Sequence, residues 1–293
     1  MTDNVVMPLR VGTRTLARIR RRLVRVPVSL EQALQGAAPQ LPPLPRDADG
    51  YLIAALPVAA RPILERQTGL SLFVRQGYRR SYARLDGGFD AYLGRFSSKT
   101  RSTLKRKLRK LAEESGGTID VRTYSTPDEA EVFHRLARPL SARTYQERQL
   151  GYGLPEGEEA LAEMRALAAR GAMRGWLLFL HGKPISYLYA PADGPTLVYA
   201  YLGYDPDYAQ LSPGTVLQLE VMRRLMEERR FALFDFTEGE GRHKQQFETG
   251  AIDCVDLLLL RPTVGNLAVA CLLAGFDSAV ALAKRMVRVK DSR

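Results

Sequence analysis

Cysteine and histidine are both scarce in this sequence of 293 residues. The two cysteines, Cys254 and Cys271, stand alone in apolar surroundings, and the three histidines, His134, His181 and His243, are far apart. Disulfide-stapled domains and zinc sites need paired cysteines, or cysteine and histidine at short fixed spacings. We therefore predict neither a disulfide framework nor a metal site, and we expect both cysteines to be buried thiols.

The sequence also lacks a long uncharged hydrophobic run. Residues 263–289 come nearest, with Thr263 as a helix cap, but Asp277 interrupts the apolar stretch. A membrane span needs about 20 largely uncharged residues, and an aspartate at its centre costs about 3 kcal/mol. We expect a helix that docks on the domain. The alternative is a helix that lies on a membrane surface, with its basic C-terminal end on the lipid headgroups.

Acidic residues are sparse in the first third of the chain. Residues 1–112 contain 22 of the 43 basic residues but only 7 of the 32 acidic ones, which leaves 21 basic and 25 acidic residues for the rest. A field of this sign favours phosphorylated ligands, nucleic acid or an anionic membrane surface, without choosing among them. No apolar run follows the basic segment Arg14–Arg25, as it would in a signal peptide. We expect a cytoplasmic protein, peripheral at the inner face of the membrane if the basic surface binds lipid.

Composition and turn signals divide the chain into segments. Alternating arginine and apolar residues at 14–26 suggest a short basic amphipathic helix within an otherwise irregular start. Four segments are predicted: a basic irregular N-terminal arm and linker (1–50), a small α/β portion (51–94), the main domain (95–262) and a C-terminal helix (263–293).

The most basic stretch is Ser97–Ala112, which has the pattern of a helix. Leucines at 104, 108 and 111 fall on one face, which is expected to pack against the domain, while lysine and arginine fill the rest. The basic face is either solvated or a phosphate-contacting surface. Arg101 and Lys105, one turn apart near the N-terminal end, are the candidates for contact with phosphate.

Strand and helix patterns alternate through the main domain. Strands are predicted at 118–124, 176–181, 184–190, 196–204, 233–236 and 253–260, with helices at 126–137, 141–150, 158–170 and 215–229. Tight turns make the strands between 176 and 204 an antiparallel meander. The strand at 233–236 follows a helix, so it is most simply parallel to its neighbour. We predict an α/β (α+β) fold with a mixed, mostly antiparallel sheet flanked by helices.

The order strand, glycine-containing loop, helix, strand appears at residues 196–236. At the start of the helix Ser212 can serve as the cap, Pro213 suits the first turn and Gly214 has no side chain to obstruct a ligand. Free amides at a helix N-terminus and the helix dipole favour an anion. Two parallel strands that diverge leave a cleft beyond their C-terminal ends. We therefore predict an anion site at residues 212–215.

A polar cluster follows the strand at 233–236. Asp235, Glu238 and Glu240 are carboxylates with the chemistry of a general base, and Lys244 can stabilise an oxyanion or neutralise a phosphate. For Asp235 the alternative is a structural carboxylate that caps the turn after the strand. For Lys244 the alternative is a surface ion pair.

Three patterns together resemble the GNAT superfamily of acyltransferases. These are the Ser-Pro-Gly helix start at 212–214, the Asp-Phe strand end at 235–236, and Gly239 followed by Lys244-x-x-Phe247. More narrowly, they are similar to the acetyltransferase family associated with cellulose and exopolysaccharide biosynthesis, which is related to the Fem peptidyltransferases. The resemblance covers about residues 95–261.

The sequence departs from the family pattern at two places. The pyrophosphate loop of GNAT enzymes is richer in glycine, and here only Gln210 and Gly214 of it remain. The family often has an aromatic residue before the lysine, where this chain has His243.

The resemblance implies a GNAT-like fold, an acyl-CoA donor and no metal. Strand amides at 201–203 would polarise the thioester carbonyl, and the first helices of the domain would form the acceptor wall, although ordinary helix packing also explains Tyr145 and Gln146. The implied residues are Tyr201, Gly203, Ser212, Gly214 and Thr215 for the donor; Arg101, Lys105, Tyr145, Gln146 and His243 for the acceptor; and Lys244, Asp235 and Glu238 for catalysis.

Three hypotheses for function remain. The first is an N-acyltransferase that moves an acetyl or other acyl group from acyl-CoA to an amine, in polysaccharide or cell-envelope biosynthesis. The second is a Fem-like ligase that uses aminoacyl-tRNA, which would explain the basic first third of the chain. The third is a binding module that kept the fold and lost the chemistry, for which the reduced phosphate loop is the support.

Overall fold

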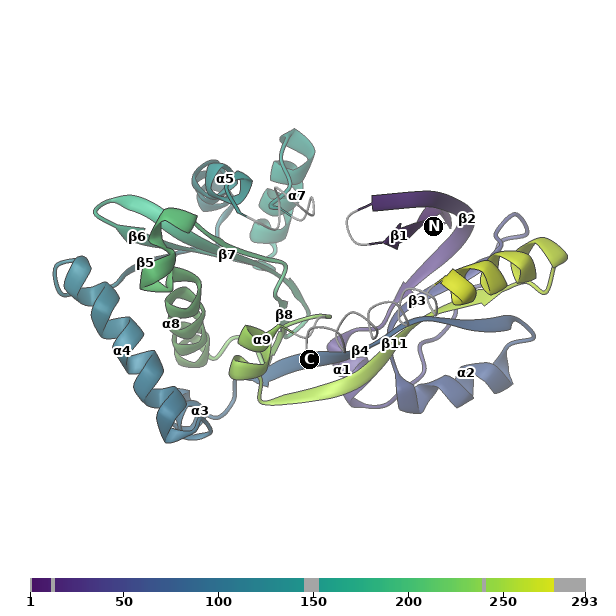
Figure 1. The fold of residues 1–293 in the computed structure, drawn as a ribbon, viewed down its shortest axis with the longest axis horizontal. Coiled ribbons are helices and arrows are strands. Elements are labelled where there is room, and N and C mark those ends of the chain that lie inside the picture. The colour runs from purple at the N-terminus through teal and green to yellow at the C-terminus, as the bar shows by residue number, and fades with distance from the viewer. Residues whose placement is uncertain (1, 12–13, 145–152, 239–240, 277–293) are drawn as a thin grey trace, which may run out of the picture. The chain divides into compact units, whose positions relative to one another are not determined.

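The computed structural model describes residues 2–11, 14–144, 153–238 and 241–276 (Figure 1). The chain divides into two compact units, a first unit of residues 1–80 with 252–293 and a central unit of residues 81–251. Strands β4 (Ser71–Arg84) and β11 (Gly250–Leu260) cross from one unit into the other.

The first unit is a sheet with short helices. Its strands lie in the order β1, β2, β3, β11, β4; β1 and β2 are antiparallel, β2 and β3 parallel, and β3 and β11 antiparallel. Besides β4 and β11, the elements of this unit are β1 (Thr2–Val11), β2 (Arg14–Pro27), α1 (Leu30–Leu34), β3 (Gly50–Pro57), a 3-10 turn (Val58–Ala60) and α2 (Arg61–Gln67).

The N-terminal segment corrects the prediction of an irregular arm with a basic helix. Residues 14–27 are strand β2, which pairs with β1 on one side and with β3 on the other. Val24 and Val26 are buried, with Arg25 exposed between them. This period of two fits a strand, and β-branched valine prefers one. The strands that pair with β2 lie outside this segment. The prediction was wrong because it used only the alternation of arginine and apolar residues within the segment.

A helix over residues 264–276 packs on the sheet of the first unit. Ala270 and Leu273 join Leu258 and Leu260 of β11 in one buried cluster. Thr263 caps this helix as predicted, since its Oγ1 accepts the amide N–H of Asn266 at 3.2 Å. Among the described residues, no helix is both long and apolar enough to cross a membrane.

The two cysteines lie in different environments. Cys254 in β11 is buried as expected, but Cys271 is exposed on the helix over 264–276. The expectation for Cys271 was wrong because apolar sequence neighbours on a helix face different directions.

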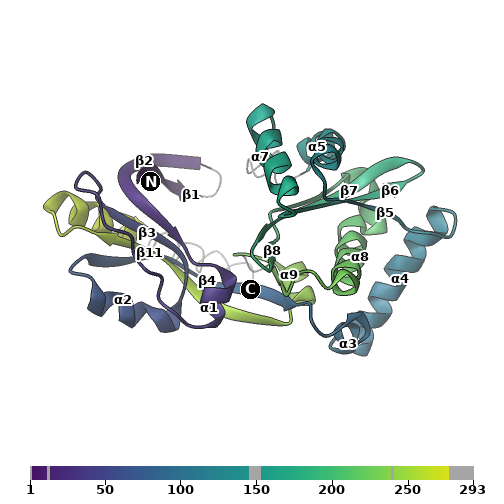
Figure 2. The ribbon, with the colours of Figure 1, turned by 180° about the vertical axis from the view of Figure 1, so that it is seen from behind.

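The central unit is a twisted sheet covered by helices on both faces (Figures 1 and 2). Its strands follow the order β4, β10, β8, β7, β6, β5, and β9 pairs with β7. Its strands are β5 (Asp120–Tyr124), β6 (Met173–Leu180), β7 (Lys183–Asp193), β8 (Thr196–Val198), β9 (Tyr201–Tyr204) and β10 (Leu233–Asp235). Its helices are α3 (Phe89–Gly94), α4 (Ser98–Glu114), α5 (Pro127–Ala142), α7 (Glu158–Ala169), α8 (Pro213–Glu228) and α9 (Arg242–Phe247).

Two buried clusters explain why β6 is buried along its whole length. Trp176 and Leu178 face the cluster shared with α4 and α8, whereas Leu177 and Phe179 face the cluster shared with α5 and α7. Alternate residues of a strand point to opposite faces, so a strand covered on both sides has no polar side. The sheet is mixed and mostly antiparallel, with β8 and β10 parallel, as the sequence predicted.

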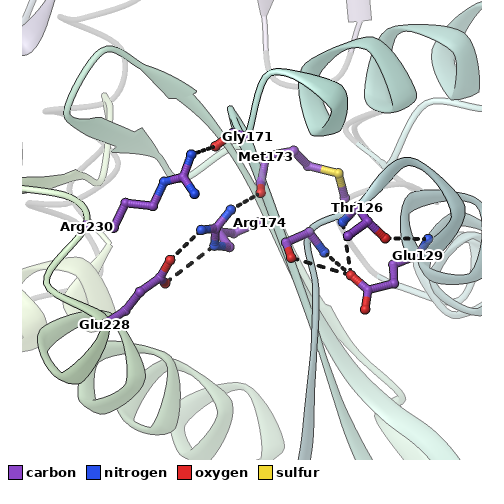
Figure 3. A network of polar contacts seen from close by, with 8 residues as sticks. Thr126, Glu129, Gly171, Met173, Arg174, Glu228 and Arg230 are labelled. Carbon is purple, nitrogen blue, oxygen red and sulfur yellow. Dashed lines mark hydrogen bonds and ion pairs between the residues drawn. The ribbon is translucent and has the colours of Figure 1, made fainter.

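Helix α5 begins as predicted and ends later. Thr126 and Glu129 form a capping box, in which each side chain accepts from the other residue's amide (Figure 3). The helix then continues through Pro139 to Ala142, whereas the sequence placed a break near 137.

A partly buried ion pair fixes the C-terminal end of α8 to the sheet (Figure 3). The Arg174 guanidinium of β6 donates to both carboxylate oxygens of Glu228 and to the carbonyl of Met173. It also lies over the ring of Phe231, 5.1 Å from its centroid. Beside it, Arg230 donates to the carbonyl oxygen of Gly171 at 3.0 Å. These contacts hold the helix whose other end forms the candidate site.

Removing the partner of Arg174 should destabilise the fold. The Glu228 side chain is 33% exposed, so we expect Glu228→Ala to lower the free energy of unfolding by about 2 kcal/mol, below the roughly 3–5 kcal/mol of fully buried pairs. Glu227→Ala on the same turn is the control, because its pair with Arg223 is solvent-exposed. Urea unfolding measures both variants, and equal stabilities would contradict the expectation.

Candidate functional site

The strand after residue 196 changes its partner in the middle. Up to Val198 it is β8, parallel to β10, and the amide of Tyr199 still donates to the Asp235 carbonyl at 2.8 Å. The next amide, that of Ala200, donates instead to Tyr189 of β7 at 3.2 Å, and β9 continues along β7. β9 and β10 therefore diverge, as the sequence predicted. Among the described strands β9 pairs with β7 alone, so its other edge carries backbone groups outside the ladder.

A short turn leads from β9 into α8. A 3-10 segment (Pro206–Leu211) ends at Ser212, whose backbone is left-handed with φ 54° and ψ 46°. Pro213 occupies the first turn as predicted. Ser212 is the N-cap residue as predicted, but its side chain accepts no helix amide, and its carbonyl takes the amides of Thr215 and Val216 instead.

The amide of Gly214 is the free donor of this turn. Pro213 has no N–H, and the amides of Ser212, Thr215 and Val216 all bond within the chain. No contact within the described residues takes the N–H of Gly214. One oriented amide at a helix N-terminus therefore remains for a ligand.

A cavity of about 260 Å³, here called the α8 cavity, opens beside this amide. It lies at the point where β9 leaves β10, between the turn, β9 and α9. Its walls are Tyr199, Leu202, Tyr204, Ala209, Ser212, Pro213, Gly214, Thr215, Gln218 and Phe247. Ser212, Gly214 and Thr215 were assigned to the donor from sequence, and the structure brings these three together on the cavity wall.

The other two predicted donor residues, Tyr201 and Gly203, lie on β9 with their side-chain positions on the opposite face. The Tyr201 ring stacks on Tyr189, with ring centroids 6.3 Å apart. A Cβ at Gly203 would lie 2.5 Å from Tyr187 and 2.6 Å from Thr144, so glycine is required there. Only the backbone of these two residues can serve a ligand in the α8 cavity.

Two lysines of α4 reach the turn, and the sequence did not single them out. Lys107 Nζ donates to the Thr215 hydroxyl at 3.2 Å, and Lys110 Nζ donates to the Gln210 carbonyl at 3.2 Å. Burial lowers the pKa of Lys107, with a smaller contribution from Arg106 in the same direction. Lys107 lies three residues after Leu104 and four before Leu111, both buried. That spacing was the signal that it faces the domain.

Arg101 and Lys105, which the sequence analysis chose as phosphate contacts, lie elsewhere on α4. Arg101 donates to the carbonyls of Gly94 and Phe96, at 3.3 and 2.6 Å, which ties α4 to the end of α3. Lys105 is exposed. Both line a separate surface hollow that shares no wall residue with the α8 cavity.

Lys244 lies on α9, near Tyr199 of the cavity wall but not among the residues that line the cavity. Its Nζ donates to the carbonyl of Glu238 at 2.5 Å and is 5.6 Å from the centroid of the Tyr199 ring. Burial lowers its pKa, and the nearby Asp235 and Glu238 act against that shift. Phe247, one turn along α9, is held by Tyr92 of α3, whose hydroxyl donates to the Phe247 carbonyl at 2.6 Å. A partly desolvated cation thus sits next to the aromatic end of the cavity.

Two of the predicted carboxylates, Asp235 and Glu238, differ in exposure. Asp235 is buried at the end of β10, and its Oδ1 accepts the amide of Thr237 at 2.8 Å, where the backbone is left-handed with φ 61°. This contact is the turn-capping role held open for Asp235. Glu238 is exposed.

Three further predictions fall on positions that the structure does not describe. Tyr145, Gln146 and Glu240 lie outside the described residues. The backbone of His243 lies in α9, next to Lys244, but its side chain is not among the described parts of the structure. Among the described residues no cluster of three or more histidine, cysteine, aspartate or glutamate side chains could hold a metal ion.

A buried carboxylate fixes where the turn begins. Asp205, the residue after β9, is fully buried and accepts from Arg143 at 2.5 Å and from Lys183 at 3.2 Å. Arg143 also pairs with Asp207 at 2.7 Å. Two cations compensate the desolvated charge, so the chain between β9 and α8 is anchored at its first residue.

Gln218 is the other wall residue that sequence reasoning missed. It lies in α8, where the apolar residues around it suggested only a packing helix. Its side chain is 2% exposed, and neither its oxygen nor its nitrogen has a hydrogen-bond partner in the described part of the chain.

A model of the family described as "Acetyltransferase (GNAT) domain" matches residues 98–245. The match starts at the first residue of α4 and includes every wall residue of the α8 cavity except Phe247. No curated protein matches the sequence.

Solved structures with a similar fold have little sequence identity to this chain. FemX has a TM-score of 0.55 and 13% identity, covering 75% of this chain and 74% of its own. The C-terminal domain (DUF2156) of a protein assigned as lysylphosphatidylglycerol synthetase from Agrobacterium fabrum has a TM-score of 0.53 and 11% identity, over 77% and 72%. L-PGS from Bacillus licheniformis has a TM-score of 0.51 and 13% identity, over 77% and 71%. At these identities the likeness shows the fold alone.

Proposed function

The chain belongs to the acetyltransferase (GNAT) domain family, and from that premise we propose that it is an N-acyltransferase that moves an acyl group from acyl-CoA to an amine. The observation that carries the proposal is the α8 cavity, which joins an unbonded helix amide to the point where β9 and β10 diverge.

The outer end of the cavity suits the phosphates of the donor. The Gly214 amide offers a hydrogen bond along the helix dipole, and Lys107 and Lys110 supply positive charge from α4. In this proposal Ser212, Gly214 and Thr215 contact the pyrophosphate. The two lysines take the place of the additional glycine amides that this glycine-poor loop lacks.

The Tyr199 side of the cavity, with Lys244 next to it, suits the reaction. The amine nitrogen attacks the thioester carbonyl carbon, a C–N bond forms and the C–S bond breaks, so that the CoA thiolate leaves and takes up a proton. A β9 amide at 201–203 polarises the carbonyl, and Lys244 stabilises the oxyanion. Glu238, which is exposed, takes the proton from the amine through water, and Asp235 adds negative charge that keeps Lys244 protonated.

The acceptor in this proposal is an amine of a polysaccharide or cell-envelope precursor. The resemblance of the Ser-Pro-Gly and Lys-x-x-Phe patterns to the exopolysaccharide family supports that class. Tyr145, Gln146 and His243 are its proposed contacts, and Arg101 and Lys105 would bind a phosphate or an anionic membrane surface near it.

A second candidate function is transfer from aminoacyl-tRNA. Two observations favour it: the exposed basic hollow on α4, formed with Arg101, Lys105, Arg106 and Arg109, and a fold shared with FemX and with a protein assigned as lysylphosphatidylglycerol synthetase. In this case tRNA would bind the basic face of α4.

Thermal unfolding with acetyl-CoA tests the first candidate. A ligand at 100 times its dissociation constant stabilises the native state by about 2.7 kcal/mol, so we expect a rise in Tm of several degrees. Mass spectrometry should then detect an N-acetylated amine and free CoA thiol. The absence of both a Tm shift and a product would contradict the proposal, and a product would exclude a binding module without chemistry.

Binding of tRNA as a function of salt tests the second candidate. Neutralisation of several phosphates predicts an affinity that falls by about 10³-fold or more between 50 and 200 mM salt. A flat response would exclude it.

A further inference from the structure

The helix over residues 264–276 has apolar side chains on the side that faces solvent (yellow in Figure 1). It contains no charged residue. Its exposed positions are two glycines and six residues that we call the outer face: Val264, Leu267, Ala268, Cys271, Leu272 and Ala274. Val264 is 86% exposed, Leu272 55% and Leu267 41%. A helix on the surface of a soluble domain normally carries polar residues on this side, so the outer face indicates contact with an apolar partner.

The opposite side of this helix is already used by the first unit. Asn266 is buried, and it accepts from Arg21 Nε at 3.1 Å and donates to the carbonyl of Arg261 at 3.2 Å. Arg21 also donates to the carbonyl of Gly265 at 3.1 Å. Together with the buried cluster of Ala270, these contacts fix the rotation of the helix on the sheet. The outer face therefore stays available for a partner.

The size of the outer face favours a lipid surface over a second copy of the chain. A helix of this length is about 20 Å long and about 10 Å wide, so its outer face covers about 200 Å². A stable protein–protein interface buries about 800 Å² on each partner. A membrane sets no such minimum, because a helix can lie in the plane of the lipid headgroups with only its apolar side inserted.

The charge of the first unit selects the kind of membrane. Residues 1–80 and 252–276 contain 14 arginines and 7 aspartates or glutamates, a formal net charge of +7. On β2 the side chains of Arg18, Arg20, Arg22 and Arg25 are exposed. Positive charge of this kind attracts anionic lipids and repels a second copy. A nucleic acid would also attract the arginines, but it would leave the outer face in water.

We propose that the first unit binds the surface of an anionic phospholipid bilayer, with the outer face of the helix over 264–276 among the lipid headgroups. This surface is separate from α4, and the contact requires no acyl transfer. The inference can therefore fail while the acyltransferase proposal holds, and the reverse.

Cys271 provides a direct probe of the contact. It is exposed on the outer face, whereas Cys254 is buried, so a thiol-reactive, polarity-sensitive dye attaches to the folded full chain at Cys271. We expect the dye emission to shift to shorter wavelength on vesicles of phosphatidylcholine with phosphatidylglycerol, but not on phosphatidylcholine alone. The control carries the dye on Val58→Cys in a Cys271→Ser background. Val58 is exposed and follows β3 at the end away from Leu260, so no shift is expected there.

Serine in place of both Leu267 and Leu272 removes apolar surface without adding charge. We expect this double variant to co-sediment with the anionic vesicles at least about tenfold more weakly, because two leucine side chains no longer leave water. Its Tm should stay close to that of the wild type, since both side chains are exposed. Val58→Ser combined with Ile63→Ser is the matched control, because these residues are exposed and apolar but lie outside the helix. This control should bind like the wild type.

Four results would overturn the inference. The first is a wild type that binds neither kind of vesicle, and the second is equal binding to neutral and anionic vesicles. The third is binding of the leucine-to-serine variant equal to that of the wild type with no shift of the dye at Cys271, which would place the membrane contact on another surface such as α4. The fourth is a dimer in analytical ultracentrifugation that the same variant loses, which would show that a second copy covers the outer face.

Discussion

Tryptophan in place of Gly214 is expected to reduce affinity for acyl-CoA by about 100-fold or more, equivalent to at least about 2.7 kcal/mol. A Cβ at this position already lies 3.2 Å from Leu202 Cδ2 and 3.4 Å from Tyr204 Cδ1. The indole would therefore extend into the α8 cavity, which has a volume of about 260 Å³. The ring would also cover the free amide of Gly214.

Calorimetry with acetyl-CoA measures this loss, and circular dichroism checks that the variant is folded. Gly87→Trp is the control for added bulk, since a side chain there meets no atom within 4 Å and the position is exposed. Gly214→Ala should cause a smaller loss, because Leu202 has to move by only a few tenths of an ångström. Unchanged affinity in the tryptophan variant would mean that the donor binds elsewhere.

Methionine in place of Lys244 is expected to lower kcat by about 10²–10³-fold, the usual effect of losing one oxyanion donor. The KM for acyl-CoA should change little, because Lys244 is not one of the residues that line the α8 cavity. Steady-state kinetics separates the two constants. Lys99→Met, an exposed lysine at the start of α4, is the control for loss of one positive charge. Equal kcat in wild type and Lys244→Met would contradict the assigned role.

The pH dependence gives an independent test of the charge of Lys244. Burial lowers the pKa of Lys244 below the usual value of a lysine, so its ammonium loses a proton at lower pH than an ordinary lysine does. If the charged form stabilises the oxyanion, kcat falls as the pH rises through that lowered pKa. Lys244→Arg should keep the charge and move this alkaline decrease to higher pH. An increase in kcat over the same range would instead identify the neutral amine as a base.

Local sequence patterns were sufficient for most elements of the central unit. The order of strand, turn, helix and strand from 196 to 236 needed only residue type and spacing, and so did Pro213 in the first turn of α8 and the caps at Thr126 and Thr263. These features depend on backbone geometry and on bonds within a few residues. Because such interactions are local, the sequence states them directly.

The site needed information that no local pattern contains. Lys107 meets Thr215 across 108 residues of sequence, and Arg143 meets Asp205 across 62. The sequence showed that α4 is basic, but its rotation on the sheet decided that Lys107 and Lys110 reach the turn while Arg101 and Lys105 do not. The prediction for residues 14–27 failed for the same reason, because the pairing of β2 with β1 and β3 depends on residues outside the segment.

The sequence by itself determined the fold class, the order of elements from 196 to 236, the glycine at the helix start and the residues Asp235, Glu238 and Lys244 as the polar group after a strand. Only the tertiary structure decided that β9 changes partner at Ala200, that a cavity forms there and that Gln218 lies on its wall without a hydrogen-bond partner in the described chain. The physical reason is that secondary structure follows from short-range periodicity. A cavity and the pairing of a buried polar group depend on which distant side chains the fold brings to the same place.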